Sequence, residues 1–414
     1  MIARHVQRYR NRIHRSFLLS SSNAEELHTQ ASIVGAGLAG SLLAVYLRRR
    51  GYRVDVFEKL SDMRKCTEGG GRSINLVLTS RGLHALNQVG LKERIQEITV
   101  PVYGRALHSM DGEVAIQKYG PDSTHFNLSV SRSELNKALM TAAEEAGAKI
   151  HFDVDLNDFD LESCTFTMTS DNSREKVVAD HIFGVDGANS SIRTEIISLA
   201  INSQNDVIPL GTSYKELSLG LLEDGTEPLR TDMLHIWPRG SHFMMGLANQ
   251  DGSMTMTLYL PDKGEISVEA LSESKIKVRD YFETFYPDVI PMMPNYLDEY
   301  HSNPDGFLGT LRCRPWHWKG NAVLLGDACH AITPFFGQGC NCSFEDVVSL
   351  DQHMGAKGVM VPKSEMKKVF ECTFFIFSNT HTHTHTHTHT YIHTNQQRTI
   401  WIENRTETRS RILL

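Results

Sequence analysis

The chain contains 414 residues, of which 40% are hydrophobic and 22% are charged, and its formal net charge is −7. This composition excludes collagen-like, disulfide-scaffold and fully disordered proteins. The acidic balance argues against a nucleic-acid partner, because binding to nucleic acid depends on cationic contacts to phosphates. The seven cysteines are odd in number and include no C-x-x-C pair, so neither a disulfide framework nor a metal site is expected.

The first 24 residues are rich in arginine and contain no acidic residue, and their apolar residues recur at helical spacing. This pattern is typical of a mitochondrial presequence, and a disordered basic tail is the alternative. We therefore assign residues 1–30 to a targeting or disordered segment.

Folded structure is expected to begin with a β-α-β unit. Residues 31–34 form a short apolar strand that runs into Gly35, residues 38–50 read as a helix, and residues 53–57 read as a second strand. Helices at 81–89 and 133–146 follow, and Ser131 is the predicted cap of the second.

Between these two helices, Asp111-Gly112 marks a hairpin. The pattern changes again near Pro209, where three strand-like segments indicate an antiparallel sheet inserted into the first fold. These three strands are 234–237, 243–247 and 254–260. The other predicted elements are a strand at 322–325 and helices at 278–286 and 344–354.

A glycine-rich motif lies at the turn of the β-α-β unit. Gly35, Gly37 and Gly40 are spaced G-x-G-x-x-G, and Glu58 ends the next strand. The first glycine permits the tight turn, the second lets a pyrophosphate approach the backbone, and the third allows close helix packing. Glu58 can accept hydrogen bonds from an adenosine ribose. The alternative is a purely structural turn, but strand, helix and distal acid together favour a dinucleotide site.

Two further motifs follow strands. Asp186-Gly187 lies in a strand–turn–helix segment after His181–Phe183, and Asp327 ends the apolar strand at 322–325. Ligands bind at the carboxyl ends of strands in open α/β sheets. Gly337 and Gly339 leave backbone N–H groups free ahead of the next helix, which suits the developing negative charge of a flavin.

The order of these three motifs resembles the aromatic-hydroxylase class of FAD-dependent monooxygenases from about residue 31 to about residue 355. Within that class the chain is most similar to the members that hydroxylate L-kynurenine. The strings that carry this similarity are residues 71–76, 108–110, 128–132, 234–239 and 334–339.

The resemblance implies an α/β fold in which a Rossmann-like FAD-binding domain carries an inserted antiparallel-sheet substrate domain. The expected FAD-binding domain is discontinuous, the substrate domain covers 206–304, and an aberrant low-complexity tail covers 356–414. The FAD-binding segments are 31–105, 120–205 and 305–355.

Site residues are implied position by position. The resemblance places Glu58 at the ribose with Lys59 beside it, Arg132 at the phosphate–ribityl region, Leu156 at the adenine and Asp327 at the ribityl chain. The other implied FAD ligands are Gly35, Gly37, Ala39 and Gly40 at the pyrophosphate, Asp186 in the motif linked to FAD and NADPH, and Cys340 and Asn341 at the isoalloxazine.

Arg105 and Tyr119 match the two residues that bind the substrate α-carboxylate in the members that hydroxylate L-kynurenine. A guanidinium binds a carboxylate bidentately, and a phenol adds a neutral donor. A two-residue turn at Asp111-Gly112 would pair Arg105 with Lys118 and place Tyr119 on the other face of the hairpin. We therefore predict a bulge or a longer turn that brings Arg105 and Tyr119 together.

The implied reaction uses FAD, NADPH and O₂ to convert L-kynurenine to 3-hydroxykynurenine, in tryptophan degradation toward quinolinate and NAD. The protein's tasks are to position the substrate and to exclude water. Phe243 and Met245 of the central sheet are expected to cover the substrate ring. No catalytic base is assigned. Two alternatives stay open: a truncated, non-catalytic flavin-binding product, and a flavin hydroxylase of another aromatic substrate.

The end of the chain departs from the class. Residues 380–394 alternate threonine and histidine almost without a break, as a translated CA-dinucleotide repeat would, and a metal-binding histidine tract is the alternative. The class continues with an Asn and a Tyr that complete the carboxylate clamp and with a membrane anchor, none of which has a counterpart here. The resemblance implies the mitochondrial outer membrane, and the missing anchor leaves a soluble protein as the other expectation.

Overall fold

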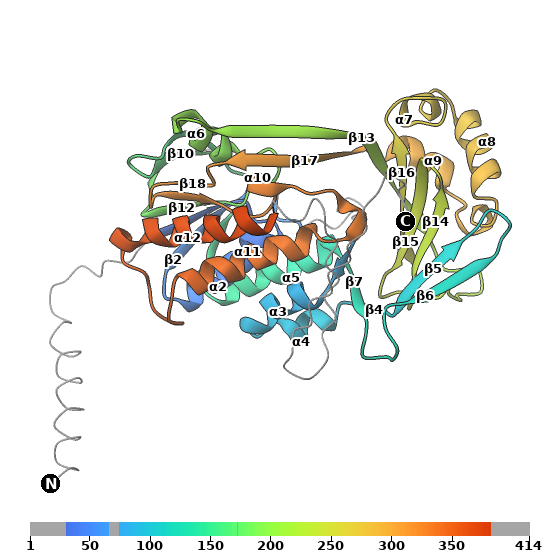
Figure 1. Ribbon diagram of the computed structural model, residues 1–414, viewed down its shortest axis with the longest axis horizontal. Coiled ribbons are helices and arrows are strands. Elements are labelled where there is room, and N and C mark those ends of the chain that lie inside the picture. Colours follow the sequence, from blue (N-terminus) through green and yellow to red (C-terminus); the bar gives the residue numbers. More distant parts are fainter. Residues whose placement is uncertain (1–29, 66–73, 172, 382–414) are drawn as a thin grey trace, which may run out of the picture.

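The computed structural model describes residues 30–65, 74–171 and 173–381. The expected targeting segment, apart from Gln30, and nearly all of the His-Thr tract lie outside these residues. Two lobes are visible in Figure 1, one built on a parallel sheet and the other on an antiparallel sheet, and the long strands β13 and β17 run between them. Strand β13 covers Gln204–Leu219 and β17 covers Gly306–Arg314.

A six-stranded sheet in the order β18-β19-β12-β1-β2-β8 forms the core of the first lobe. All strands except the edge strand β18 run parallel, which places the carboxyl ends of β1, β2, β12 and β19 on one edge of the sheet. The bounds are β1 Gln30–Val34, β2 Arg53–Phe57, β8 Lys149–His151, β12 His181–Gly184, β18 His317–Trp318 and β19 Ala322–Leu324.

Helices of this lobe pack together through apolar faces. Helix α2 contacts both α5 and α11, and Leu42, Leu43 and Leu135 are almost completely buried between them. Ser131 caps α5, since its Oγ accepts a hydrogen bond from the Glu134 N–H, as predicted. The bounds are α2 Leu38–Arg49, α3 Ser80–Gln88, α4 Lys92–Gln96, α5 Arg132–Glu145, α6 Ser191–Leu199, α10 Asp327–His330 and α11 Gly339–His353.

A seven-stranded sheet in the order β17-β13-β16-β15-β14-β5-β6 forms the second lobe. One face is covered by three helices around buried Trp237 and Phe282, and the alternate residues of the strands face the first lobe. The bounds are β5 Gly104–His108, β6 Val114–Lys118, β14 Leu234–Arg239, β15 His242–Ala248, β16 Met254–Pro261, α7 Val268–Leu271, α8 Lys275–Phe285 and α9 Tyr296–Ser302.

Smaller elements complete the fold. One three-stranded sheet, in the order β3-β7-β4, joins the two lobes, since the Asn75 amide donates to the carbonyls of Leu247 and Ala248 in the second lobe. Another, in the order β11-β10-β9, flanks the parallel sheet. The bounds are β3 Asn75–Leu78, β4 Val100–Val102, β7 Asn127–Ser131, β9 Asp155–Asp160, β10 Thr165–Ser170, β11 Ser173–Val178, η1 Ile290–Met292 and η2 Pro334–Phe336.

The last described helix begins inside the segment that we expected to be an aberrant tail. Helix α12 covers Lys363–His381 and buries Met366 and Phe370 against the first lobe, where Phe370 contacts Phe183 edge-on. The expected domain boundaries stay a prediction, but residues up to Phe370 share the core of the parallel-sheet lobe. Among the described helices, none has both the length and the apolar character needed to cross a membrane.

Candidate functional site

A cavity of about 1370 Å³ lies at the carboxyl edge of the parallel sheet, between the two lobes. The loops after β1, β2, β12 and β19 form one wall, and the antiparallel sheet forms the other. Most of the predicted site residues line it, namely Gly35, Gly37, Ala39, Glu58, Lys59, Arg105, Tyr119, Arg132, Leu156, Asp186, Asp327 and Cys340. Gly40 and Asn341 do not.

The glycine-rich turn is shaped by contacts that only glycine permits. Gly35 has φ +103°, and a Cβ there would approach the Val185 carbonyl oxygen to 2.6 Å. A Cβ at Gly40 would clash with the Gly35 carbonyl oxygen, so Gly40 acts by letting α2 approach the turn rather than by lining the cavity. A Cβ at Gly37 would meet nothing within 4 Å, so the protein leaves free the place predicted for a pyrophosphate.

Glu58 is held over this turn by the backbone. Its Oε2 accepts a hydrogen bond from the Ala36 N–H at 2.8 Å, and its Oε1 accepts one from the Leu60 N–H at 2.9 Å. Both contacts fix the carboxylate at the end of β2, facing the cavity. Lys59 and Leu156 also line the cavity, and their place beside an adenosine stays a prediction.

Polar groups without protein partners face the middle of the cavity. Asp186 accepts hydrogen bonds from the Ser191 N–H and hydroxyl through Oδ2, while its buried Oδ1 has no partner among the described residues. Asp327 is exposed to the cavity, and partial desolvation by the surrounding protein raises the pKa of its carboxyl. Burying a polar group without a partner costs free energy, so the Asp186 Oδ1 indicates a ligand with a hydroxyl or N–H donor.

Replacing Asp327 with asparagine is expected to stabilise the apoprotein and weaken FAD binding. Because its folded-state pKa lies above the ordinary 3.8, the wild-type carboxyl contributes stability when protonated and loses that contribution as pH rises through the folded pKa. Asparagine has no such loss, so the melting temperature of the variant apoprotein should increasingly exceed that of wild type as the pH rises above 3.8. A variant apoprotein that melts below wild type at pH 8 would contradict this account.

The start of α11 contributes differently from the prediction. Cys340 lines the cavity, and burial raises the pKa of its thiol to about 12, so it stays a neutral thiol. Asn341 is fully buried: its Oδ1 accepts hydrogen bonds from the Thr79 N–H and hydroxyl, and its Nδ2 donates to the carbonyls of Val77 and Gly337. Its side chain therefore ties α11 to the β3–α3 turn, because a helix places successive side chains on different faces.

Arg105 and Tyr119 share one face of the β5–β6 hairpin, which confirms the longer turn that the sequence required. The strands pair His108 with Val114 and Arg105 with Gln117, so residues 109–113 form the turn. The Arg105 guanidinium lies 6.0 Å from the centroid of the Tyr119 ring and forms a hydrogen bond with the Tyr119 side chain. The Arg105 Nε is buried and has no partner among the described residues.

Sequence reasoning missed most of the wall formed by the antiparallel sheet. Met245 lines the cavity as expected, whereas Phe243 lies beside it and stacks on Tyr259 at 4.5 Å. The residues that were missed alternate along their strands, which is the signal that could have found them. They are Glu216, Leu234, Leu247, Thr255, Thr257 and Tyr259, together with Phe335 from η2.

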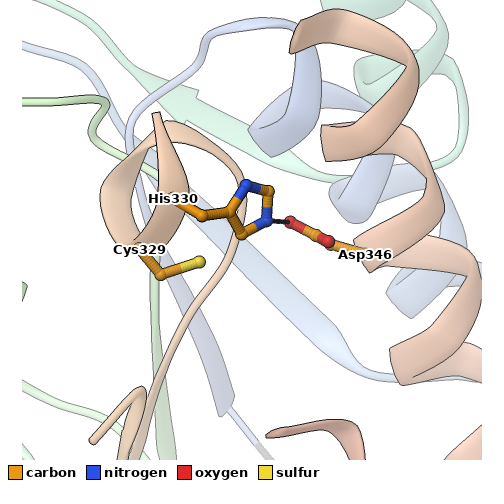
Figure 2. A group of neighbouring side chains, drawn as sticks. All are labelled: Cys329, His330 and Asp346. Atoms are coloured by element: carbon orange, nitrogen blue, oxygen red, sulfur yellow. Dashed lines mark hydrogen bonds and ion pairs between the residues drawn. The ribbon is translucent and has the colours of Figure 1, made fainter. Parts of the chain in front are cut away.

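Behind Asp327, a buried cluster has the residue types of a metal site. Cys329, His330 and Asp346 lie close together, and Figure 2 shows the His330 ring directed at Asp346. The Cys329 thiol donates to the Gly326 carbonyl at 3.2 Å. Asp346 Oδ2 accepts hydrogen bonds from His330 Nε2 and the Gly326 N–H, both at 2.6 Å. Burial alone would lower the pKa of His330, but the Asp346 carboxylate raises it, so this is an ion pair that joins α11 to the Asp327 turn.

Comparisons with known proteins agree with this geometry. The family described as "FAD binding domain" matches residues 28–266 and 308–357. The kynurenine 3-monooxygenase of Stenotrophomonas maltophilia is 40% identical over 78% of this chain and 71% of its own length, and that of Salinispora tropica is 42% identical over 78% and 72%.

Solved structures show the same fold at low identity. The tetrameric form of 2-methyl-3-hydroxypyridine-5-carboxylic acid oxygenase has a TM-score of 0.64 and 20% identity, covering 84% of this chain and 86% of its own. PqsL of P. aeruginosa has a TM-score of 0.66 and 16% identity, covering 85% and 91%. The expected α/β fold, an FAD-binding domain with an inserted antiparallel sheet, is thereby confirmed.

Proposed function

The chain belongs to the kynurenine 3-monooxygenase family, and on this premise we propose that it hydroxylates L-kynurenine to 3-hydroxykynurenine with FAD, NADPH and O₂. The observation that carries the proposal is that one cavity holds both the glycine-rich turn and the Arg105–Tyr119 pair. A cofactor seated on the turn would extend toward an amino acid whose carboxylate is bound by Arg105.

The residues present fit FAD. Gly37 leaves open space at the amino end of α2, where unpaired N–H groups favour phosphate. Arg132 lines the cavity as a cation for the phosphate–ribityl region, and the unpartnered oxygen of Asp186 and the Asp327 carboxylate are acceptors for its hydroxyl and N–H groups. Bound FAD, reduced by NADPH, supplies the chemistry that activates O₂ for transfer of one oxygen atom to the aromatic ring.

The protein's own contribution is to place the substrate. Arg105 and Tyr119 donate hydrogen bonds to the α-carboxylate, and the buried Arg105 Nε gains the partner that it lacks. From that anchor, Leu234 and Met245 form an apolar surface for the aromatic ring. This apolar surface keeps water from the reacting carbon, which the ring's own amine already activates. No protein base is assigned.

A location in mitochondria remains part of the proposal and rests on the arginine-rich segment at residues 1–30. The relatives named above come from bacteria and give it no support. Attachment to a membrane, expected from the resemblance, likewise has no support from a described helix.

Kynurenine-dependent oxidation of NADPH by the purified full chain tests the function. We expect FAD to co-purify or to bind on addition, and NADPH oxidation in air to rise on adding L-kynurenine, with 3-hydroxykynurenine formed. Flavin binding without kynurenine-dependent turnover would favour a non-catalytic flavin protein. Turnover only with a different aromatic acid would assign another substrate, and a folded protein that does not bind FAD would contradict the proposal.

A further inference from the structure

A pair of buried histidines joins the Arg105 hairpin to the rest of the antiparallel sheet. His108 is the last residue of β5 and His235 lies in β14, and both side chains are on the sheet face opposite the cavity. His108 Nε2 lies 2.8 Å from His235 Nδ1. The two residues are 127 positions apart in the sequence, so this contact is tertiary and not part of a local turn.

The hairpin lies at the edge of the seven-stranded sheet. Strand β5 pairs with β14 only from Arg105 to Leu107, and every residue of β6 is exposed on the outer edge. In the pairing, Arg105 lies opposite Leu234, the residue just before His235. The histidine pair is therefore the side-chain contact that joins β14 to the end of β5, three residues from the substrate-binding arginine.

The hydrogen-bond partners define the tautomer of each ring. His235 Nε2 lies 2.8 Å from the Arg230 carbonyl oxygen, which only accepts, so Nε2 carries the proton. Burial lowers the pKa of both rings, to about 4 for His108, so both are neutral at pH 7. His235 Nδ1 is then an acceptor, and His108 Nε2–H is its donor.

Other contacts hold the His108 ring in this orientation. It stacks on the Trp237 ring with centroids 4.1 Å apart and planes 13° apart. Trp237 Nε1 donates to Asp288 at 2.7 Å, and an Arg239 guanidinium nitrogen donates to the His108 carbonyl at 2.9 Å. The pair is thus part of an ordered buried network, in which a lost partner leaves a buried acceptor unpaired.

We propose that His108 and His235 are positioning residues that hold the β5–β6 hairpin against β14 and thereby place Arg105 for the substrate carboxylate. This inference rests on the proposed function, since it assigns to Arg105 the binding of that carboxylate. Neither histidine touches the cavity. Their loss should therefore weaken binding of kynurenine and leave FAD binding unchanged.

Steady-state kinetics of the FAD-loaded full chain test the proposal. His108→Phe keeps a ring to stack on Trp237 but cannot donate to His235, and it is expected to raise KM for kynurenine about tenfold with little change in kcat. His108→Gln retains an N–H donor of similar reach and should restore KM toward wild type. His235→Phe should raise KM at least as much, since it also removes the hydrogen bond to the Arg230 carbonyl. The double variant should be no worse than His235→Phe alone, because the two histidines share one contact.

His242→Phe is the matched control. His242 is also buried on the covered face of this sheet, and it contacts Tyr281 at 2.7 Å but not β5. The His242→Phe variant should lower the melting temperature about as much as His108→Phe does, while leaving KM for kynurenine unchanged. If His108→Phe fails to fold, His108→Asn, whose amide is too short to reach His235, takes its place with the same expected rise in KM.

The outcomes separate the two proposals. If Arg105→Ala raises KM but the His108 variants do not, or if His242→Phe raises KM equally, the positioning role is wrong. If Arg105→Ala itself leaves KM unchanged, the proposed carboxylate site is wrong. The proposal also requires that the His108 variants bind FAD as tightly as wild type, measured by adding FAD to apoprotein. A loss of FAD affinity would indicate general damage to the fold.

Discussion

Replacing Arg105 with alanine is expected to raise KM for L-kynurenine by a hundredfold or more, with FAD still bound. The guanidinium is half-buried with its Nε unpartnered among the described residues, so a bound carboxylate would be its main hydrogen-bonding partner besides Tyr119. Hydrogen bonds to charged groups contribute about 1.5–3 kcal/mol each, and two of them correspond to at least about a hundredfold in affinity. Initial rates at varied kynurenine concentration measure the effect.

Two comparisons make this prediction specific to the carboxylate. Gln117 pairs with Arg105 across the hairpin but is exposed, so Gln117→Ala should leave KM unchanged. Kynurenamine, which lacks the α-carboxylate, should bind wild type and Arg105→Ala equally weakly. A variant that discriminates between kynurenine and kynurenamine as strongly as wild type would rule out carboxylate binding by Arg105.

Alanine at Gly37 and at Gly40 should both abolish FAD binding, but for different reasons. A Cβ at Gly37 projects into open space, so Gly37→Ala should fold with the melting temperature of wild-type apoprotein and lose FAD because the methyl group occupies the pyrophosphate position. A Cβ at Gly40 clashes with the Gly35 carbonyl, so Gly40→Ala should also destabilise the apoprotein. Quenching of FAD fluorescence and thermal melting of apoprotein measure the two effects.

Gly220→Ala is the control for these variants, because its Cβ also meets nothing within 4 Å and it does not line the cavity. It should leave both FAD affinity and the melting temperature near wild type. Normal FAD binding by Gly37→Ala would mean that the pyrophosphate does not lie on this turn, which would overturn the cofactor site.

The cofactor side of the cavity could be predicted from the sequence because its geometry is local. Gly35 and Glu58 are placed by the turn and strand that contain them, and the carboxyl ends of parallel strands meet at one edge. The position of Arg105 relative to Tyr119 could also be predicted, since the period of two along a strand allows only certain registers. The structure confirms the longer turn at residues 109–113.

The long strand β13 and the meander β9–β11 were missed because their patterns are weak. Residues 204–211 of β13 are largely exposed and include Pro209 and Gly211, which favour turns in short-range reasoning. Strand β9 has little buried surface and so no clear alternation. These strands are held by pairing with partners far along the chain, which periodicity alone does not reveal.

Asn341 and the His108–His235 pair show a second limit. The side chain of Asn341 turns back to the β3–α3 turn, 262 residues earlier, and so satisfies buried backbone groups instead of facing the cavity. The histidine pair depends on parallel pairing of β5 with β14. Sequence spacing predicts neither, because both follow from how the two lobes and the sheet order bring distant segments together.

Titration of the FAD-loaded full chain with L-kynurenine, followed by the visible flavin absorption, tests the central claim most directly. If FAD and the Arg105 site share one cavity, kynurenine should perturb the flavin spectrum saturably in wild type, and Arg105→Ala should shift the midpoint at least about a hundredfold higher. A flavin spectrum that does not respond to kynurenine, or that responds with the same midpoint in both proteins, would contradict the account.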